Sequence, residues 1–421
     1  MSETDALTWA RANTPVLQSL ATAHATDTPF AGLTVAVATH LEAKSGVLIE
    51  TLAAAGASVA FTPSEPQSTH GDVVDTLDAQ DAITAYAWEG MTDEEFADAQ
   101  HTLLETAEPD IILDDGCELI AKVHAAHPEV AETVLGGGEQ TTAGITRLEA
   151  MDAEGVLAFP CFTVNDTPMK HYFDNVHGTG ESALANIAIS TNTVLSGTTV
   201  VIAGYGYCGR GVARKARGVG AQTIVTEVDP RKALQAHMDG HRVLSMAQAA
   251  PIGELFITTT GTREVLRAEH IEQMQDGAQL ANAGHFDVEI DLAGIEAMAT
   301  ETSEPTPGVR SYHLSDGRRI HLLAEGRLVN LTGPYSSGHP AEVIYTTHAR
   351  MFAAGREVAT RHAELSPGVY AIPDRVDRQI AERKLRTLGV ETDEPTAAQD
   401  AYRDDWQHAE AGFQLLPMPA P

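Results

Sequence analysis

The stretch TTVVIAGYGYCG, residues 198–209, constrains the fold of this 421-residue chain more than any other part of the sequence. An apolar run ends at Gly204, and Gly206 and Gly209 then open a helix-like segment. In this pattern the first glycine makes a tight turn, the second lets the backbone approach a pyrophosphate, and the third allows the helix to pack closely. Glu227 ends the next apolar run, where a carboxylate would bind ribose hydroxyls and repel a 2′-phosphate. The sequence therefore predicts a Rossmann domain that binds NAD rather than NADP.

Strand-like and helix-like segments alternate on both sides of this motif, and such alternation is typical of parallel sheets covered by helices. The strand-like runs are at 33–40, 58–63, 110–116, 223–228, 254–260 and 278–284. We predict an α/β protein with two doubly wound parallel-sheet domains, the second inserted in the first, and a hairpin that turns at Asp316-Gly317. The predicted parts are a substrate-binding domain (1–180), an NAD-binding Rossmann domain (181–340), a return to the substrate domain (341–390) and a C-terminal tail (391–421).

Polar side chains follow several of these runs directly. His40 and Asp115 do so in the first half, and Thr260, Asn282 and His285 do so in the second. Ligands of parallel sheets bind outside the carboxyl ends of the strands, so these residues are candidates for a site, with Thr260 and Asn282 on the cofactor side. His40 and Asp115 each have a purely structural alternative. Asp115 could cap a helix, and a histidine at a strand end, such as His40, is more often structural than catalytic.

Charge and composition narrow the classes of partner. The formal net charge is −32, only six of the 27 basic residues are lysines, and acidic residues are spread along the whole chain. This pattern indicates adaptation to a cytoplasm of molar salt, where the Debye length is only ~3 Å. Nucleic acid and anionic membranes are excluded as partners of such a surface. The three cysteines lack metal-ligand spacing, and neither a signal peptide nor a long apolar span is expected, so we predict a cytoplasmic protein without a metal.

Several motifs together resemble the adenosylhomocysteinase family, up to about residue 390. They are DDG (114–116), EQTT (139–142), KHYFDN (170–175), GYGYCG (204–209), GHFDVEID (284–291) and AEGRLVN (324–330). The resemblance implies a homotetramer that hydrolyses S-adenosyl-L-homocysteine reversibly to homocysteine and adenosine, with NAD as a recycled catalyst. In that family, oxidation of the ribose 3′-hydroxyl acidifies the C4′ hydrogen, homocysteine is eliminated, water adds and the ketone is reduced again. The reaction has no net redox change.

The resemblance also implies a role for each matching residue. Lys170 and Asp174 would lie at the 3′-hydroxyl, where a lysine beside a carboxylate assists proton removal. His40, Asp115 and His285 would surround C4′ and C5′, and no single base is assigned among the three. The remaining implied contacts are His339 at the purine, Asn175 and Asn330 at the nicotinamide, Thr141 and Thr142 on NAD from the substrate domain, and Gly204, Gly206, Gly209 and Glu227 along the dinucleotide.

Two positions depart from the family pattern. Gln140 stands where the family usually has a glutamate that binds the ribose, and a glutamine can still accept a hydrogen bond but brings no charge. Lys44 stands where many members have a glutamate facing the purine. An ammonium only donates and suits the carbonyl of hypoxanthine, so S-inosylhomocysteine becomes a candidate substrate. The alternative for Lys44 is that it points to solvent or pairs with a carboxylate.

Three functions compete at this point. The first is the hydrolase, and its alternative is a catalytically silent, NAD-binding regulatory paralogue, which the changes at Gln140 and Lys44 would permit. A silent relative has no chemical need for the full polar set, and its retention argues against that alternative. The retained residues are Lys170, Asp174, His40, Asp115 and His285. An ordinary NAD-dependent dehydrogenase with net redox fits the glycine motif, but it leaves the polar residues of the first half unexplained.

Overall fold

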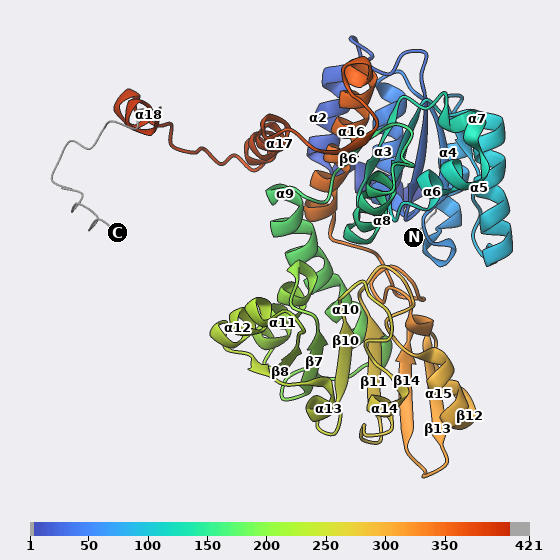
Figure 1. Ribbon diagram of the computed structural model, residues 1–421, viewed down its shortest axis with the longest axis vertical. Coiled ribbons are helices and arrows are strands. Elements are labelled where there is room, and N and C mark those ends of the chain that lie inside the picture. The colour runs from blue at the N-terminus through green and yellow to red at the C-terminus, as the bar shows by residue number, and fades with distance from the viewer. Residues whose placement is uncertain (1–3, 405–421) are drawn as a thin grey trace, which may run out of the picture.

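The computed structural model describes residues 4–404 of the chain. It contains two α/β units, each built around one sheet, and Figure 1 shows them one above the other with the chain crossing between them twice. The prediction of two parallel-sheet α/β domains is confirmed.

The first sheet has seven parallel strands in the order β15-β6-β5-β4-β1-β2-β3. Alternate residues of its central strand face opposite sides, so Val35 and Val37 enter one apolar core while Ala36 and Ala38 enter another. The strands are β1 (Thr34–Thr39), β2 (Ser58–Pro63), β3 (Ile83–Ala85), β4 (Ile111–Asp114), β5 (Gly136–Glu139), β6 (Pro160–Thr163) and β15 (Gly368–Ala371).

Helices cover both faces of this sheet. The long helix α16 packs against α3 and α2 on one face of the sheet, although these two helices lie far from it in the sequence. The helices of this unit are α1 (Thr4–Ala12), α2 (Pro15–His24), α3 (Ala43–Ala54), η1 (Pro66–Ser68), α4 (Gly71–Asp78), α5 (Asp93–Ala107), α6 (Glu118–Ala126), α7 (Pro128–Ala131), α8 (Thr142–Ala153), α16 (Ala341–Arg361), η4 (His362–Glu364) and α17 (Asp374–Thr387).

The second sheet has eight strands in the order β12-β13-β14-β11-β10-β7-β8-β9. Its central strands are parallel, and β12 and β13 add an antiparallel edge. The predicted hairpin turn is confirmed, since β13 and β14 are joined through Gly317 at a φ of +91°. The strands are β7 (Thr199–Ala203), β8 (Gln222–Thr226), β9 (Arg242–Val243), β10 (Leu255–Thr258), β11 (Ala278–Asn282), β12 (Ala299–Thr306), β13 (Val309–Leu314) and β14 (Arg319–Leu323).

A helical connection leads from the first unit into the second. The short helix α9 runs into a π-helical segment, η2, and then into α10, which packs on the first helix after the glycine motif, α11. The helical elements of the connection and of the second unit are α9 (Pro168–Lys170), η2 (His171–Thr179), α10 (Gly180–Thr191), α11 (Tyr207–Gly218), α12 (Pro230–Met238), α13 (Met246–Ala249), α14 (Ala268–Ile271), α15 (Leu292–Met298) and η3 (Ala324–Gly326).

The end of the described chain leaves the body of the molecule. Figure 1 shows α17 at the side of the first unit and α18 (Ala397–Asp404) beyond it, at the end of an extended segment. Residues 389–396 between the two helices are all exposed. The rest of the predicted C-terminal tail, residues 405–421, lies outside the described residues.

Candidate active site

A cavity of about 1040 Å³ lies between the two units and is lined by residues of both. In each sheet, the strand order reverses beside the first strand of the unit: between β1 and β4 in the first sheet and between β7 and β10 in the second. Ligands of open α/β sheets bind at such switch points, outside the carboxyl ends of the strands. Both switch points contribute residues to this one cavity, so it is the candidate active site.

At the first switch point, His40 follows β1 and Asp115 follows β4, and both side chains are buried. Asp115 does not cap the next helix. The N-cap of α6 is Cys117, and the neighbouring carboxylate of Asp114 accepts the backbone N–H of Ile120 at 2.9 Å. The structural alternative for Asp115 is therefore wrong, and its carboxyl group faces the cavity.

The tautomer of His40 follows from its hydrogen bonds. Its Nδ1 lies 2.8 Å from the hydroxyl of Ser68, and that hydroxyl donates its own proton to the carbonyl of Glu65 at 2.7 Å. Because the Ser68 proton is used, the His40 Nδ1–H must be the donor to Ser68. The Nε2 of His40 is left with a lone pair, and it lies 3.7 Å from Oδ2 of Asp115.

His285 comes from the loop after β11 and completes this group across the two units. One ligand atom from each of His40, Asp115 and His285 lies within 4.8 Å of the others, a spacing that could also hold a metal ion. Burial, then the charge of Lys170, lowers the pKa of His285 to about 4. Burial, with His285 and His339 nearby, holds the pKa of His40 well below its usual range. Both imidazoles are therefore neutral at pH 7.

Asp115 shares this neutral environment. Burial raises the pKa of its carboxyl to about 7, and the negative charges of Asp114 and Asp174 act in the same direction against the lowering effect of Lys170. The amide of Gln140 donates to Asp115 Oδ2 at 3.0 Å. At neutral pH this carboxyl group consequently gains and loses a proton beside the lone pair of His40.

A second buried group lies in the same cavity and is ionised. Lys170 Nζ is 3.2 Å from Oδ1 of Asp174, and the hydroxyl of Thr347 donates to the other carboxylate oxygen at 2.7 Å. His339 Nδ1 is 3.4 Å from the same Oδ1. Burial alone would raise the pKa of Asp174, but Lys170, His339 and Thr347 together lower it far below its usual range.

The π-helical segment η2 presents this ionised group to the cavity. Lys170 ends α9, and Asp174, Asn175 and Thr179 follow within the π-helical turns and line the cavity. Such segments are rare in proteins and are frequently found at functional sites. The sequence showed the cluster of polar residues but not this backbone, because no residue pattern distinguishes a π-helix from an α-helix.

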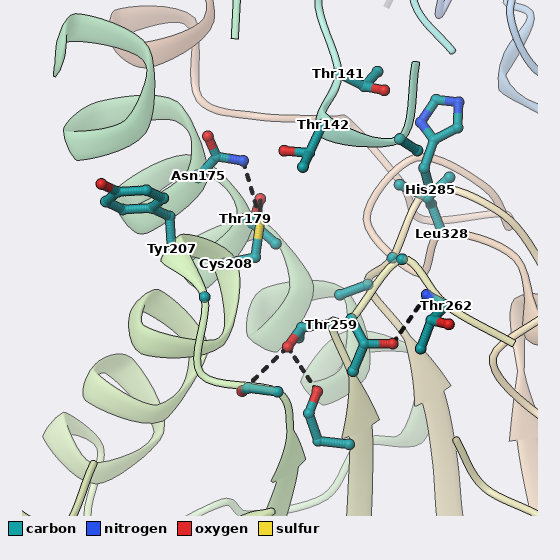
Figure 2. A pocket seen from close by; sticks show the side chains of 18 of the residues that line it. Thr141, Thr142, Asn175, Thr179, Tyr207, Cys208, Thr259, Thr262, His285 and Leu328 are labelled. Carbon is teal, nitrogen blue, oxygen red and sulfur yellow. Dashed lines mark hydrogen bonds between the residues drawn. The ribbon is translucent and has the colours of Figure 1, made fainter. Parts of the chain in front are cut away.

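The glycine motif forms a cradle at the end of β7. Gly204 has a φ of +97°, and a Cβ on Gly209 would lie 2.0 Å from the Gly204 carbonyl oxygen, so neither position tolerates a side chain. Glu227 accepts the backbone N–H of Tyr205 at 2.7 Å and lines the cavity. Figure 2 shows Asn175 directed at Cys208, with the amide 3.2 Å from its sulfur.

Most residues predicted for the site line this one cavity. Three of those predicted do not: Lys44, Gly209 and Asn282. Figure 2 shows His285 on the side of the cavity where Thr141 and Thr142 enter from the other unit. The predicted residues that line the cavity are His40, Asp115, Gln140, Thr141, Thr142, Lys170, Asp174, Asn175, Gly204, Gly206, Glu227, Thr260, His285, Asn330 and His339.

Asn282 supports a loop instead of facing the cavity. Its amide nitrogen donates to the carbonyls of Phe286 and Gly326, and its amide oxygen accepts from Thr258 and Gly284. With every hydrogen-bonding position used, this side chain has no free group for a cofactor. It holds the loop that carries His285.

Lys44 pairs with a carboxylate, which is the alternative that the sequence left open. Its Nζ lies 2.7 Å from Oε2 of Glu42 and donates to the carbonyl of Ser337 at 2.7 Å. Glu42, rather than Lys44, lines the cavity. Glu42 is therefore part of the cavity wall, and Lys44 lies behind it, against the second crossing between the units.

Several residues that line the cavity carry buried polar atoms without a protein partner. Among the described residues these include both polar atoms of the Asn330 side chain, Oδ1 of Asn175 and Oε1 of Gln140. A buried polar atom without a partner costs about 1–3 kcal/mol, so a bound ligand with donors and acceptors is expected there. Together with the glycine cradle, these atoms fit a dinucleotide and a polar second ligand.

Among the side chains of the cavity wall that sequence reasoning missed are Glu42 and His348. His348 is fully buried on α16, and burial lowers its pKa to about 4. The signal that could have found His348 is helical periodicity. Ile344 and His348 lie one turn apart, and both line the cavity.

Comparison with known proteins gives one consistent result. A family model described as S-adenosyl-L-homocysteine hydrolase, NAD binding domain, matches residues 175–336. The S-inosyl-L-homocysteine hydrolase of Methanopyrus kandleri is 47% identical, over 96% of this chain and 94% of that protein. The adenosylhomocysteinase of Halobacterium salinarum is 49% identical, over 95% and 93%, and that of Haloquadratum walsbyi is 48% identical, over 95% and 92%.

Proposed function

The chain belongs to the S-adenosyl-L-homocysteine hydrolase family, and on that premise we propose that it reversibly hydrolyses S-adenosyl-L-homocysteine to homocysteine and adenosine with NAD as a recycled cofactor. The observation that carries the proposal is that two groups of titratable side chains lie in one cavity. One is the ionised Lys170–Asp174 pair, and the other is the neutral group of His40, Asp115 and His285.

The Lys170–Asp174 pair acts at the ribose 3′-hydroxyl. When bound, NAD⁺ supplies the hydride acceptor for the 3′ carbon and later returns the hydride. Asp174 stays ionised and holds Lys170 in place, so the ammonium and carboxylate can orient the hydroxyl and pass its proton on. Glu227 and the glycine cradle would hold the adenine-ribose half of the dinucleotide, and Asn175 and Asn330 would hold the nicotinamide half with their free amide atoms.

The neutral group acts at C4′ and C5′. The lone pair on His40 Nε2 can accept a proton, while Asp115, with a pKa of about 7, can either give or take one. This suits a reaction in which a C4′ proton leaves, a thiolate is protonated, and water is later deprotonated. Groups that can exchange protons near neutral pH suit this role, because each must take a proton in one step and give one in another.

We place the purine beside Glu42, which lines the cavity, with its partner Lys44 behind it. Glu42 can accept from the amino group of adenine, and Lys44 behind it can donate toward the carbonyl of hypoxanthine. Relatives of both names, adenosylhomocysteinase and S-inosyl-L-homocysteine hydrolase, share about half of this sequence. We therefore propose that S-inosylhomocysteine is also hydrolysed, and that the Glu42–Lys44 pair lets the site accept either purine.

One experiment tests the proposed reaction. The purified protein in molar KCl is given S-adenosyl-L-homocysteine or S-inosyl-L-homocysteine, and free thiol and absorbance at 340 nm are followed together. We expect thiol release from both substrates without accumulation of NADH. Steady growth of NADH would indicate an ordinary dehydrogenase, and the absence of thiol release with both compounds would indicate a silent regulatory paralogue.

We further propose that the enzyme is a cytoplasmic homotetramer adapted to high salt. The net charge of −32 and the similarity to proteins of Halobacterium and Haloquadratum support adaptation to salt. Among residues 4–404, no helix combines the length and apolar character needed to cross a membrane. The tetramer rests on the family resemblance alone. Light scattering in 3 M KCl and in dilute buffer tests both points, with a tetramer expected in KCl and dissociation or unfolding without it.

A further inference from the structure

Two buried imidazole nitrogens of the cavity wall have no hydrogen-bond partner among the described residues. One is Nδ1 of His339, which lies 3.4 Å from the carboxylate of Asp174, and the other is Nδ1 of His348, which has no such charge partner. His348 is 1% exposed and lies on α16 next to Thr347, the partner of Asp174. Its Nδ1 has no hydrogen-bond partner among the described residues. The side chain lines the cavity, and Asp174, Glu42 and Lys44 all lie close enough to shift the pKa of its imidazole.

The other ring nitrogen fixes the tautomer. A hydrogen bond between the His348 ring and the backbone of Lys44 raises the pKa of the imidazole, which means that the ring donates a proton to the Lys44 carbonyl. Because Nδ1 has no partner, this donor is Nε2–H. Burial keeps the ring neutral at pH 7, so Nδ1 carries a lone pair and can only accept.

We propose that Nδ1 of His348 accepts a hydrogen bond from the six-membered ring edge of the bound purine and thereby selects nucleosides that have a donor there. Adenine offers its exocyclic amino group, and hypoxanthine offers N1–H. Unsubstituted purine has neither. The inference rests on the proposed function, because it takes the purine to bind beside Lys44, and it adds a specificity-determining residue to that site.

The proposal explains how one site can accept both bases. Glu42 favours adenine and Lys44 favours hypoxanthine. An acceptor at His348 instead binds a hydrogen-bond donor on the six-membered ring edge, which both bases have. A buried acceptor left without a donor weakens binding by about 10- to 100-fold. Discrimination of that size against purine riboside is therefore the signature to measure.

The test is a cycle of two ligands and four proteins, measured by equilibrium binding of adenosine and purine riboside to the NAD-loaded enzyme in molar KCl. The proteins are wild type, His348→Phe, His348→Asn and the control His362→Phe. His362 follows the same helix but does not line the cavity. Phenylalanine removes the acceptor, while asparagine returns a polar atom near the position of Nδ1. Thermal melting and NAD content check that each variant is folded.

We expect wild type and His362→Phe to bind adenosine about 10- to 100-fold more tightly than purine riboside. In His348→Phe the ratio should fall by about 10-fold, leaving the share that Glu42 contributes, and His348→Asn should restore part of the loss. An unchanged ratio in His348→Phe, or the absence of a preference in wild type, would overturn the inference. Thiol release by wild type is measured in parallel, so failure of the hydrolase proposal is seen separately from a failed binding cycle.

Discussion

Two groups of titratable side chains share one cavity, yet one group is ionised and the other is largely neutral. The Lys170–Asp174 pair is ionised, whereas Asp115 has a pKa of about 7 beside two neutral imidazoles. Both carboxyl groups are buried and both feel the same lysine. The difference is that Asp174 has Lys170 at 3.2 Å and a hydroxyl donor, whereas Asp115 has only the amide of Gln140. The direct partner, and not burial, decides the charge.

The two groups also differ in how the fold assembles them. Lys170 and Asp174 belong to one continuous helical connection and lie four residues apart. The neutral group needs His40 and Asp115 from the first unit and His285 from the second, so it is complete only while the two units lie together. The ionised pair therefore depends on one helical connection, while the proton-transferring group depends on how the two units are placed relative to each other.

The largest effect is expected from breaking the ionised pair with Lys170→Met. The variant keeps the length of the side chain but removes the charge that holds Asp174 ionised. Loss of a general acid–base contribution lowers turnover by about 10²- to 10⁴-fold. Thiol release at saturating substrate measures the loss, with bound NAD quantified in the same sample.

A matched substitution controls for the loss of a lysine in this acidic chain. Lys215 pairs with Glu181 on the surface, and both side chains are partly exposed. Lys215→Met should leave turnover within about twofold of wild type, since exposed ion pairs contribute little. Equal losses in the two lysine variants would contradict a role for Lys170 at the reacting centre.

The second prediction concerns the neutral group and uses Asp115→Asn. The native pKa of about 7 lies above the unfolded value of about 3.9, so between these pH values the unfolded chain has lost a proton that the native state keeps. Wild type therefore loses stability as the pH rises from about 4 to 7, and Asp115→Asn does not. The free energy of unfolding of Asp115→Asn should therefore rise relative to that of wild type, by on the order of 4 kcal/mol across this pH range. Urea denaturation in KCl from pH 4.5 to 7.5 measures it.

Asp174→Asn gives the opposite behaviour in the same assay. The pKa of Asp174 is lowered in the native state, so its contribution to stability is present above about pH 4 and is lost only as the pH falls further. The difference from wild type should stay constant from pH 5 to 7.5. If the difference in free energy of unfolding from wild type changed with pH in the same way for Asp115→Asn and Asp174→Asn, the two groups would not differ in charge as described.

Much of this arrangement follows from sequence patterns. Alternating strands and helices predicted both sheets, and the glycine motif predicted the cradle at Gly204 and Gly209. Residues placed directly after strands, such as His40 and Asp115, do line one cavity, because parallel strands end at the same edge. The assigned roles of these residues stay predictions until the variants are measured.

The rest required coordinates. Asn282 follows a strand as His40 does, yet its amide is used entirely by hydrogen bonds within the protein. Lys44 forms an ion pair with a residue two positions away, which no motif indicated. His348 lies on α16, which re-enters the first unit only after the chain has formed the second one. Its approach to Lys44 is therefore a consequence of the chain topology. Charge states depend on such neighbours and cannot be predicted from motifs alone.

A smaller effect is expected from Ser68→Ala, which acts on the neutral group through His40. Without Ser68, the Nδ1–H of His40 loses its acceptor, and the ring can turn or adopt the other tautomer. Turnover should fall by about 10-fold, as for loss of a partner that orients a functional histidine. Ser68→Thr keeps the hydroxyl and should recover most of the activity. A fall in substrate affinity with unchanged turnover would speak against this positioning role.

The smallest effect tests what separates Asp115 from Asp174, namely the charge of the neighbour. Gln140→Glu replaces the amide that donates to Asp115 with a second carboxylate. A nearby negative charge and the lost donor both disfavour ionisation, so the pKa of Asp115 should rise above about 7, by on the order of one unit. The corresponding limb of the pH–rate profile should move to higher pH, with turnover at the optimum nearly unchanged. If the limb stays in place, Asp115 does not carry the proton that the profile reports, and His40 or His285 must do so.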